Sequence, residues 1–590
     1  MNENAYTWRY SSLGLIIFLL PVMITLQLIR IQINPGWVKE VMEFGERFEK
    51  EAQFIDPPRG QILDRKGNLL AGNQIVYEVG IDLPKVVDPR SIATVLSSIL
   101  DIDYEDVYSA ASLEASDRAV YAVVADYLPQ EKIDKLNIFI EQLDSEAIAS
   151  PEKGLFNLAG IVKKPHLGRL YPERMIGSNF MGFSHVPNVG YFGVEEQYND
   201  ILSRPRETIW VPVNPLLAEE QTDVPSGSSL ILTVDRAVQK SMEELVDEAV
   251  VETGSDSATI VVLNPKNGEI LALATTPRMD LNDISEYKNL FPQGVPYNRA
   301  IGQDYEPGSV FKVLTMAAAL DAGAVKPETQ FVDTGVIEVG GLRIYNWDSG
   351  AWGPQSMLGC LQHSLNVCLA WVSTQMGYEN FYPYMKAFGL GQLTGVDLAW
   401  EVSGRLKIPG DGDWYEADLG TNAFGQGVSA TPLQMAVAIS ALANQGKIMT
   451  PHIVKAIVNE GYLRELGTSV MRVPIKLETA NTITEMLARS LEIEASDALV
   501  TGYRVAGKTG TAEIPTPYGY TTNETNASFV GWGPADDPQF LIYIWLERPS
   551  VSPWGSVVAS PVFREAVERL VVLIDLPPDD IRHQLDQNSQ

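Results

Sequence analysis

The sequence predicts a multidomain α+β protein that carries a single N-terminal transmembrane helix. The chain has 590 residues, and at about 150 residues per domain this length exceeds one hydrophobic core. An uncharged apolar run lies near its start, and its second half reads as strands, then helices, then strands. We therefore expect an anchor followed by at least two folded domains.

The predicted anchor spans residues 10–29, which contain no charged side chain. A helix that rises about 1.5 Å per residue crosses a hydrocarbon core of roughly 30 Å over such a run. A cleaved signal peptide is the alternative, but the run is long and no small-residue cleavage site lies near Arg30, so an uncleaved anchor is favoured. Residues 1–9 would form a cytoplasmic tail. Only Arg9 precedes the run while Arg30 and Lys39 follow it, so the basic residues do not set the orientation.

Residues 30–205 are predicted to form a first folded region. Apolar residues after the anchor recur at helical spacing and indicate an amphipathic helix, namely Trp37, Val41, Phe44 and Phe48. Residues 56–72 read as a turn, a short strand, a second turn at 66–68 and another strand, and residues 100–160 have a helical period. A loop-rich stretch at 203–206 marks the boundary to the next region.

The second region, residues 206–575, opens with two β-branched runs on either side of Asn267-Gly268, a pair that favours a hairpin turn. Helices are predicted next, and strands return near the end. The predicted helical ranges are 310–322, 356–377 and 431–445, and the predicted strands are 502–513 and 526–548. This order predicts one antiparallel sheet with helices packed around it. Residues 576–590 are assigned to a C-terminal tail.

Composition excludes several classes of function. Lys and Arg number 44 against 75 Asp and Glu, a net charge of −31 that disfavours binding to nucleic acid. The five histidines are scattered, so no metal site is predicted. The two cysteines, Cys360 and Cys368, have neither metal-knuckle nor redox-pair spacing, and two small buried thiols are the favoured interpretation.

The first chemical motif joins Ser309 to Lys312. Pro307 suits a first helical turn, an Ala-rich run extends the helix, and Gly323 can cap its end. Ser309 and Lys312 then lie three residues apart on one helical face, where the amine can act as a general base for the hydroxyl. The same spacing occurs twice elsewhere in the chain, so this motif alone is weak.

The second motif is Ser364-Leu365-Asn366, which lies within an apolar segment. Burial of these two polar side chains without partners would be costly, and a site lined by a hydroxyl and an amide would satisfy them. A local cap or turn is the competing interpretation.

The third motif, Lys508-Thr509-Gly510-Thr511, lies between two strand-like runs. Gly507 and Gly510 lack side chains where a second backbone could approach, as an extended peptide adding to a strand edge would. A tight turn with an exposed lysine is one alternative. The letters GYRVAGKT at 502–509 also match a phosphate-binding loop, but the following residues are poor helix formers, so a strand is favoured.

In this order, Ser-x-x-Lys, Ser-x-Asn and Lys-Thr-Gly form the set found in serine penicillin-binding proteins and related β-lactamases. Other segments narrow the resemblance to class B, the monofunctional penicillin-binding proteins. They are 59–71 (RGQILDRKGNLLA), 169–172 (RLYP), 193–198 (GVEEQY), 232–235 (LTVD), 424–427 (FGQG) with 431–434 (TPLQ), and 528–531 (SFVG). The resemblance runs from the anchor to about residue 570. Leu365 replaces the central serine of the Ser-Ser-Asn common in this class, at a position that varies.

The resemblance implies an elongated β-rich pedestal over residues 30–205 and a penicillin-binding transpeptidase domain over residues 206–575, with helices on both sides of its antiparallel sheet. It implies a D,D-transpeptidase that acts on peptidoglycan stem peptides, is inhibited by β-lactams and needs neither cofactor nor metal. The catalytic body would lie outside the bacterial cytoplasmic membrane, held by one span. The implied partners are a glycan polymerase of the shape, elongation, division and sporulation (SEDS) family and other wall-synthesis proteins.

The resemblance also assigns roles to the motif residues. Ser309 would be the nucleophile and Lys312 its base. We also expect the charge of Lys508 to help hold Lys312 neutral, because two ammonium groups in one cleft disfavour double charging. Ser364 would relay a proton to the leaving amine, and Asn366 would hold the substrate amide. A further group would bind the substrate carboxylate along the strand, namely Thr509, Gly510 and Thr511. The backbone N–H groups of Ser309 and Thr511 would form the oxyanion hole.

Several rival functions share these motifs. A β-lactamase or a penicillin-sensing receptor would contain all three, but it would need rapid deacylation or a sensor domain behind several membrane helices. A carboxypeptidase differs only in resolving the acyl-enzyme with water, and sequence hardly separates it from a transpeptidase. A catalytically silent scaffold is disfavoured because Ser309, Lys312 and Lys508 are all present.

Overall fold

The computed structural model describes residues 4–33, 50–116, 118–149, 156–185, 189–212, 224–494, 496–516 and 519–589. The chain separates into two compact units. The first comprises Met1–Pro57 and Arg204–Pro225, and the second comprises Pro58–Ser203 and Ser226–Gln590. The predicted domain boundary at 205 and 206 stays a prediction.

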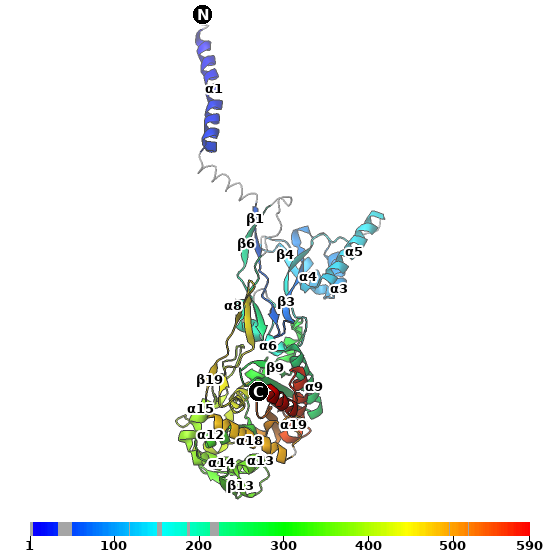
Figure 1. Cartoon of the computed structure of the whole chain (residues 1–590). Helices are drawn as coiled ribbons and strands as arrows, with labels where there is room; N and C mark the ends of the chain where they lie inside the picture. Colours follow the sequence, from blue (N-terminus) through cyan, green and yellow to red (C-terminus); the bar gives the residue numbers. More distant parts are fainter. Residues whose placement is uncertain are drawn as a thin grey trace. The chain divides into compact units, whose positions relative to one another are not determined.

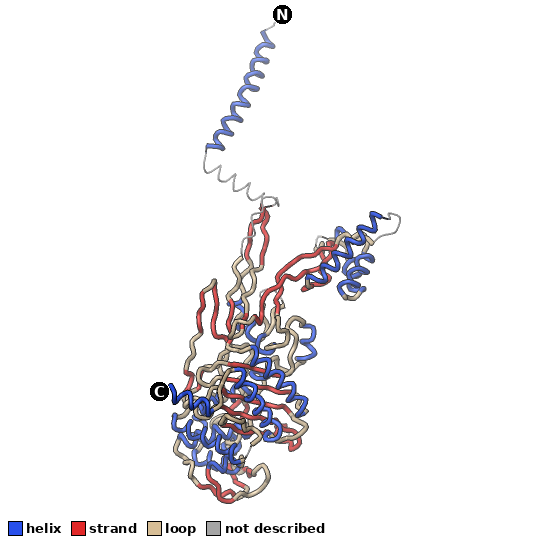
Figure 2. The backbone as a smooth tube through the Cα atoms, turned by 45° about the vertical axis from the view of Figure 1, so that its right-hand side comes forward, coloured by secondary structure: helices blue, strands red, loops and turns tan. Residues whose placement is uncertain are grey.

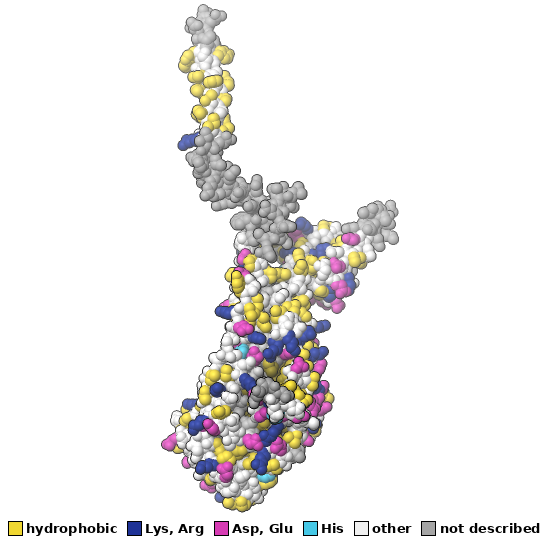
Figure 3. All heavy atoms as spheres, viewed as in Figure 1, with side chains coloured by type: hydrophobic (Ala, Val, Ile, Leu, Met, Phe, Trp, Pro, Cys, Tyr) yellow, Lys and Arg dark blue, Asp and Glu magenta, His cyan; other side chains and the backbone are white. Residues whose placement is uncertain are grey.

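The first unit contains helix α1 (Asn4–Ile33) and a pair of strands. Within α1, Trp8–Arg30 is long and apolar enough to cross a membrane, and none of it is buried. Hydrophobic side chains cover the face of α1 seen in Figure 3. Strands β1 (Lys50–Ile55) and β6 (Glu207–Pro212) pair antiparallel and lie side by side in Figure 1. The amphipathic helix predicted around Trp37 lies outside the described residues.

The second unit contains a mixed seven-stranded sheet. Its order is β18 (Tyr462–Glu465), β17 (Val454–Asn459), β7 (Ser229–Leu232), β2 (Ile62–Leu63), β3 (Leu69–Asp82) and β4 (Tyr121–Leu128), and β5 (Ile161–Leu170) pairs with β3. The predicted turn at 66–68 joins β2 to β3, and Asp64 accepts hydrogen bonds from the backbone N–H groups of Lys66 (2.9 Å) and Asn68 (2.7 Å). β2 and β7 pair in parallel, so one sheet extends across the predicted boundary.

Three helices pack against the far end of this sheet, α3 (Pro89–Leu100), α4 (Tyr104–Ala111) and α5 (Gln130–Ala149). The helical period predicted over 100–160 was therefore only partly correct. Residues 121–128 form strand β4, because pairing with β3 along a buried apolar face outweighs the local helical pattern.

An antiparallel five-stranded sheet forms the centre of the rest of the unit. Its order is β20 (Ala506–Thr516), β21 (Gly519–Gly533), β22 (Phe540–Glu547), β8 (Ser257–Leu263) and β9 (Ile270–Thr275). The predicted hairpin joins β8 to β9, with Gly268 at φ +81°. Apolar side chains of α9 (Arg236–Thr253) and α19 (Gly555–Leu573) cover one face, and α17 (Pro432–Ala443) covers the other. The predicted sheet with helices on both sides is confirmed (Figure 2).

The second unit contains further helices and strands. They are η1 (Leu83–Lys85), α6 (Ser178–Met181), α7 (Gly193–Gln197), α8 (Asn199–Leu202), η3 (Ile284–Glu286), α10 (Tyr287–Leu290), α11 (Arg299–Gly302), β10 (Gln330–Asp333), β11 (Val336–Val339), β12 (Leu342–Tyr345), β13 (Gly353–Ser356), α15 (Tyr378–Ala387), β14 (Arg405–Leu406), α16 (Glu416–Asn422), β15 (Val428–Ser429), β16 (Ile448–Met449), β19 (Val470–Arg472) and α18 (Leu477–Ile493).

The C-terminal segment folds back onto this unit. Residues assigned to a tail form helix α20 (Asp579–Ser589). Asp579 accepts a hydrogen bond of 2.7 Å from the backbone N–H of Arg504, and His583 lies 2.9 Å from Asp536. These contacts, which sequence patterns do not reveal, tie the end of the chain to the segments before β20 and β22.

Candidate active site

Ser309 lies on a tight helical turn that leads into a buried helix. Residues Gly308–Phe311 form the 3₁₀ helix η4, which continues into α12 (Lys312–Asp321). Pro307 precedes the turn at φ −71°, and Gly323 follows α12 at φ +71° in the left-handed region. In a 3₁₀ turn, residues three apart eclipse one another, so Ser309 and Lys312 lie on the same side. The predicted helix start and glycine cap are confirmed.

The turn packs directly against strand β20 because both backbones carry glycine at the contact. A Cβ atom on Gly308 would lie 2.6 Å from the carbonyl oxygen of Thr511. A Cβ atom on Gly510 would lie 2.9 Å from Val310 Cγ1 and 2.1 Å from Ser528 Oγ. The structure therefore brings the Ser309 motif and the Lys508 motif together, and the glycine of Lys-Thr-Gly permits this approach.

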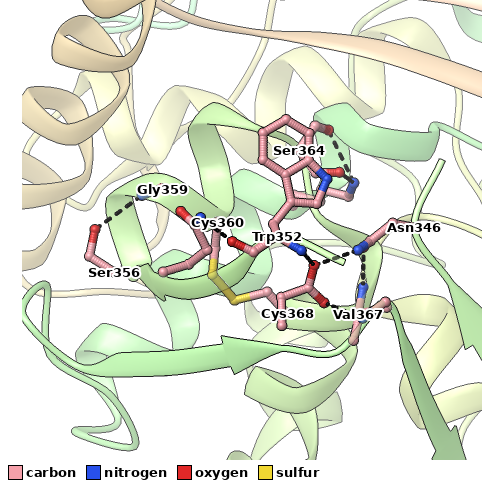
Figure 4. The surroundings of a disulfide bond; sticks show 12 residues. Asn346, Trp352, Ser356, Gly359, Cys360, Ser364, Val367 and Cys368 are labelled. Atoms are coloured by element: carbon pink, nitrogen blue, oxygen red, sulfur yellow. Dashed lines mark hydrogen bonds between the residues drawn. A yellow bond between two sulfur atoms is a disulfide. The ribbon is translucent and has the colours of Figure 1, made fainter. Parts of the chain in front are cut away.

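Ser364 lies on a turn between α13 (Met357–Gln362) and α14 (Asn366–Met376), with φ +53° in the left-handed region. The predicted helix over 356–377 is thus interrupted at the motif itself. Cys360 and Cys368 form a disulfide across this turn, four residues to either side of Ser364 (Figure 4). The predicted pair of free thiols was wrong. The chain turns between the two helices, and the cysteine Cα atoms lie 5.9 Å apart, within reach of a disulfide.

A neighbouring segment, residues 345–347, holds the Ser364 turn in place. Asn366 Nδ2 donates to the carbonyl oxygen of Tyr345 (3.1 Å), and Trp347 Nε1 donates to that of His363 (3.1 Å). Asn346 Oδ1 accepts from the backbone N–H of Val367 (3.1 Å; Figure 4). Sequence reasoning missed these residues, since no local signal links 345–347 to a motif some twenty positions later.

Lys312 Nζ lies between the two polar residues of the second motif. It donates to the carbonyl oxygen of Ser364 (2.6 Å) and to Asn366 Oδ1 (2.7 Å), and it lies 3.1 Å from the Ser364 hydroxyl, which can donate to the lone pair of the neutral amine. Among the described residues, no hydrogen bond joins Lys312 to Ser309. Catalytic hydrogen bonds often form only with substrate present. Both ends of the Asn366 amide are engaged, so in the free protein this residue positions Lys312.

The pKa of Lys312 lies well below its ordinary value. Complete burial of the side chain is the first cause, because it disfavours the charged ammonium, and the charge of Lys508 is the second. The predicted direction is confirmed, although burial contributes more than Lys508. Burial also lowers the pKa of Lys508, to about 8, against an opposing effect of Glu494. Burial and the charge of Lys508 thus favour the neutral amine at Lys312, whereas Glu494 favours the charged form of Lys508.

Two threonine hydroxyls along β20 have their oxygen atoms occupied by donors. Thr509 Oγ1 accepts from Lys508 Nζ (3.1 Å), and Thr511 Oγ1 accepts from the backbone N–H of Gly555 (3.0 Å). Each hydroxyl therefore keeps its own hydrogen for a further acceptor, such as a carboxylate. The segment is a strand without a following helix, as predicted, and the phosphate-loop alternative is excluded.

Comparison with known proteins places this geometry in a family. A family model described as the penicillin binding protein transpeptidase domain matches residues 258–568, and one described as the penicillin-binding protein dimerisation domain matches residues 54–207. The chain belongs to the penicillin-binding protein family. The two matches and the relatives below confirm the resemblance to the monofunctional class B.

This penicillin-binding protein has relatives over most of its length. It is 32% identical over 547 residues to stage V sporulation protein D of Bacillus subtilis, covering 89% of this chain and 81% of the relative. It is 26% identical over 597 residues to the peptidoglycan D,D-transpeptidase FtsI of Escherichia coli K12, covering 98% and 94%. Its fold matches penicillin-binding protein 3 of Mycobacterium tuberculosis, crystallised with aztreonam, with a TM-score of 0.66, 24% identity and coverage of 89% and 98%.

Proposed function

We propose that this penicillin-binding protein is a serine D,D-transpeptidase that cross-links peptidoglycan stem peptides through an acyl-enzyme on Ser309. The observation that carries the proposal is the convergence of three remote motifs. The turn that carries Ser309 packs against the strand that carries Lys508. Beside it lies Lys312, a buried lysine of lowered pKa that Ser364 and Asn366 hold in place. Family membership supports this assignment, and so does the activity named for the Escherichia coli relative.

In the proposed acylation, neutral Lys312 takes the proton of the Ser309 hydroxyl as its oxygen attacks the carbonyl between two terminal D-Ala residues. The new ester bond forms, the peptide C–N bond breaks, and the leaving D-Ala amine receives a proton through Ser364. The backbone N–H groups of Ser309 and Thr511 would stabilise the oxyanion, and the hydroxyls of Thr509 and Thr511 would bind the terminal carboxylate beside Gly510.

In the second step, an amine of a neighbouring stem peptide attacks the ester carbonyl and loses a proton to the same relay. Ser309 recovers its proton as the ester breaks. The products are a new peptide cross-link and the free enzyme, so atoms and protons balance without a cofactor. β-Lactams would acylate Ser309 by the same route, because they present a strained amide to the same groups.

The cellular setting is part of the proposal. The Cys360–Cys368 disulfide supports a body in the oxidising space outside the cytoplasmic membrane, with α1 as a single-pass anchor and residues 1–9 inside. The anchor and the pedestal would contact a SEDS-family glycan polymerase, and other wall-synthesis proteins would join the complex, as the family resemblance implies.

The test is labelling of the full-length protein with fluorescent penicillin, followed by peptide mapping. The adduct should map to Ser309, and Ser309→Ala should abolish labelling while keeping the wild-type melting temperature. Incubation with a pentapeptide donor, with and without an added amine acceptor, separates transpeptidation from hydrolysis by product mass. An adduct on another residue would refute the assignment, and D-Ala release that yields only hydrolysed peptide would favour a carboxypeptidase.

A further inference from the structure

The segment that leads to Ser309 runs antiparallel beside residues 425–430, which begin with a turn at 425–427. The backbone groups of Tyr305 and Ala430 exchange two hydrogen bonds of 3.1 and 3.0 Å, and the N–H of Gly308 donates to Gly425 (3.1 Å). Farther along α12, the Thr315 hydroxyl donates to the carbonyl of Ala423 (2.8 Å). The nucleophile turn is thus fixed to this segment on both of its sides.

Within this contact, Glu306 supplies an ionisable side chain three residues before the nucleophile. Its Oε1 accepts from the backbone N–H of Gly427 (3.0 Å), and its carboxylate also accepts from the Tyr520 hydroxyl (3.0 and 3.2 Å). Tyr520 belongs to β21, which forms a hairpin with β20. One half-buried carboxylate therefore joins the nucleophile segment, the 425–427 turn and the hairpin that carries the Lys508 motif.

Close packing makes the position of the 425–427 turn matter for Ser309. Gly425 has φ +83°, and a Cβ atom there would lie 2.3 Å from the carbonyl oxygen of Gly308. Gly308 in turn abuts Thr511 on β20. A shift of the turn would therefore move the residue directly before the nucleophile, and the interior lacks the space to absorb it.

We propose that Glu306 is a positioning residue for acylation, whose ionised carboxylate sets Ser309 relative to the edge of β20. This inference rests on the proposed function, because it concerns the rate at which Ser309 is acylated. Two groups, the N–H of Gly427 and the hydroxyl of Tyr520, donate to the carboxylate, and each would lose this acceptor if the carboxylate were removed. An ionised carboxylate accepts from both Gly427 and Tyr520, whereas a protonated one must use one oxygen as a donor.

This role predicts an acid limit to activity. Burial is the first cause that raises the pKa of Glu306, opposed by its hydrogen bonds and by Lys407 and reinforced by Glu513. The titratable groups that face it are Tyr520 on the hairpin, Glu513 on β20 and Lys407 before the turn. Acylation should therefore decline as the pH falls through a value above that of an ordinary glutamate.

The test measures the second-order rate of acylation by fluorescent penicillin across pH, using full-length variants. Glu306→Ala should slow acylation about 100-fold at neutral pH, the loss expected when a reacting group is misplaced by about 1 Å. Glu306→Gln presents one acceptor oxygen and one donor, as the protonated acid does. It should therefore show the low rate that the wild type reaches in acid, without an acid limit of its own. Tyr520→Phe should produce a smaller loss than Glu306→Ala.

Glu513→Gln is the matched control, because it removes the neighbouring charge and keeps an oxygen that can accept from Gln426 Nε2 of the 425–427 turn, as Glu513 does (3.3 Å). It should keep the neutral-pH rate and move the acid limit to lower pH, since Glu513 raises the pKa of Glu306. An unchanged acid limit in Glu306→Gln would overturn the proposal, as would a wild-type rate in Glu306→Ala. If Glu306→Ala fails to fold, the pH profile of Glu306→Gln decides. Wild-type protein that no penicillin acylates would refute the proposed function instead.

Discussion

At the scale of single residues, the two lysines of the site are separated by their surroundings. Lys312 is completely buried, and each of its three hydrogen bonds goes to Ser364 or Asn366. Lys508 is also buried, but Glu494 at the end of α18 favours its charged form. Glu494 lies 3.5 Å from His363, the residue before Ser364. The surroundings of Lys312 thus favour a neutral amine that can accept a proton, and those of Lys508 favour the cation.

This difference predicts a basic limit to acylation. Lys508 has a pKa of about 8, so its charge is present below that pH and is lost as the pH rises through it. Glu494→Gln removes a carboxylate that raises this pKa, and the basic limit should move to lower pH. The shift should be less than about one pH unit, because solvent screens a half-exposed charge. The acylation rate of fluorescent penicillin between neutral pH and mildly alkaline pH measures it.

The control for this prediction is Glu492→Gln. Glu492 lies on the same helix but pairs with Arg504 at 2.7 Å, away from the lysines. The Glu492→Gln substitution should leave the pH of the basic limit unchanged. A shift toward higher pH in Glu494→Gln, or an equal shift in both variants, would contradict the assigned role of Glu494.

At the scale of elements, the disulfide and the turn it encloses form one unit of the site. Ser364 has a left-handed backbone that a residue with a side chain adopts at a cost. The disulfide, together with hydrogen bonds from Trp347 and Asn346, joins the helices on both sides of that turn. The position of Ser364 therefore depends on groups outside its own motif.

Removal of the disulfide should affect both stability and acylation. The double substitution Cys360→Ser with Cys368→Ser should lower the free energy of unfolding by about 2 to 3 kcal/mol, as expected for a short closed loop. It should also slow acylation, because the Ser364 turn loses a constraint. Thermal denaturation and penicillin labelling under non-reducing conditions measure the two effects.

A reductant provides the matching control. Treated wild-type protein should resemble the double variant, while the variant itself should not respond. Equal melting temperatures for oxidised wild-type protein and the variant would show that the disulfide does not stabilise this region.

At the scale of the whole molecule, a buried ion pair network joins three segments far apart in sequence. Glu195 accepts from Arg59 Nε (2.6 Å) and Arg169 Nε (2.7 Å), and Arg169 also donates to the carbonyl of Gly60 (2.7 Å). Glu195 is fully buried. Burial raises its pKa, but the charges of Arg169 and Arg59 outweigh this and hold the pKa below its ordinary value. These residues explain three of the family-like segments, 59–71, 169–172 and 193–198.

Neutralising Glu195 should destabilise the protein. Glu195→Gln leaves two buried arginines without their charge partner, which typically costs about 3 to 5 kcal/mol. Because the folded-state pKa of Glu195 is lowered, the wild-type contribution is full above the unfolded value of 4.5 and is lost as the pH falls further. The gap in melting temperature between wild type and variant should therefore narrow in acid.

Glu173→Gln is a matched control, since it breaks only a partly exposed pair with Arg236. Such surface pairs contribute about 0 to 1 kcal/mol. A melting temperature in Glu195→Gln as high as in this control would show that the network contributes little to stability.

Much of the catalytic site could be predicted from local sequence patterns. Three features depend on residues close together in the chain. They are the spacing of Ser309 and Lys312, the strand around Lys508 and the apolar anchor. The hairpin at Asn267-Gly268 was predicted for the same reason, because a turn is encoded by the residues within it. The strand around Lys508 was predicted from the strand-like runs beside it and from the poor helix formers that follow Thr509.

Tertiary structure decided the rest. The disulfide between Cys360 and Cys368 requires a turn at Ser364, and the helical pattern over residues 356–377 does not predict this turn. Other contacts join positions that are far apart in the chain, so no local pattern predicts them. They are Glu306 with Tyr520, Tyr345 with Asn366, and strand β2 with strand β7. Sequence alone determined the motifs and the anchor. Only packing determined which side chains meet, because such contacts depend on how remote segments share one interior.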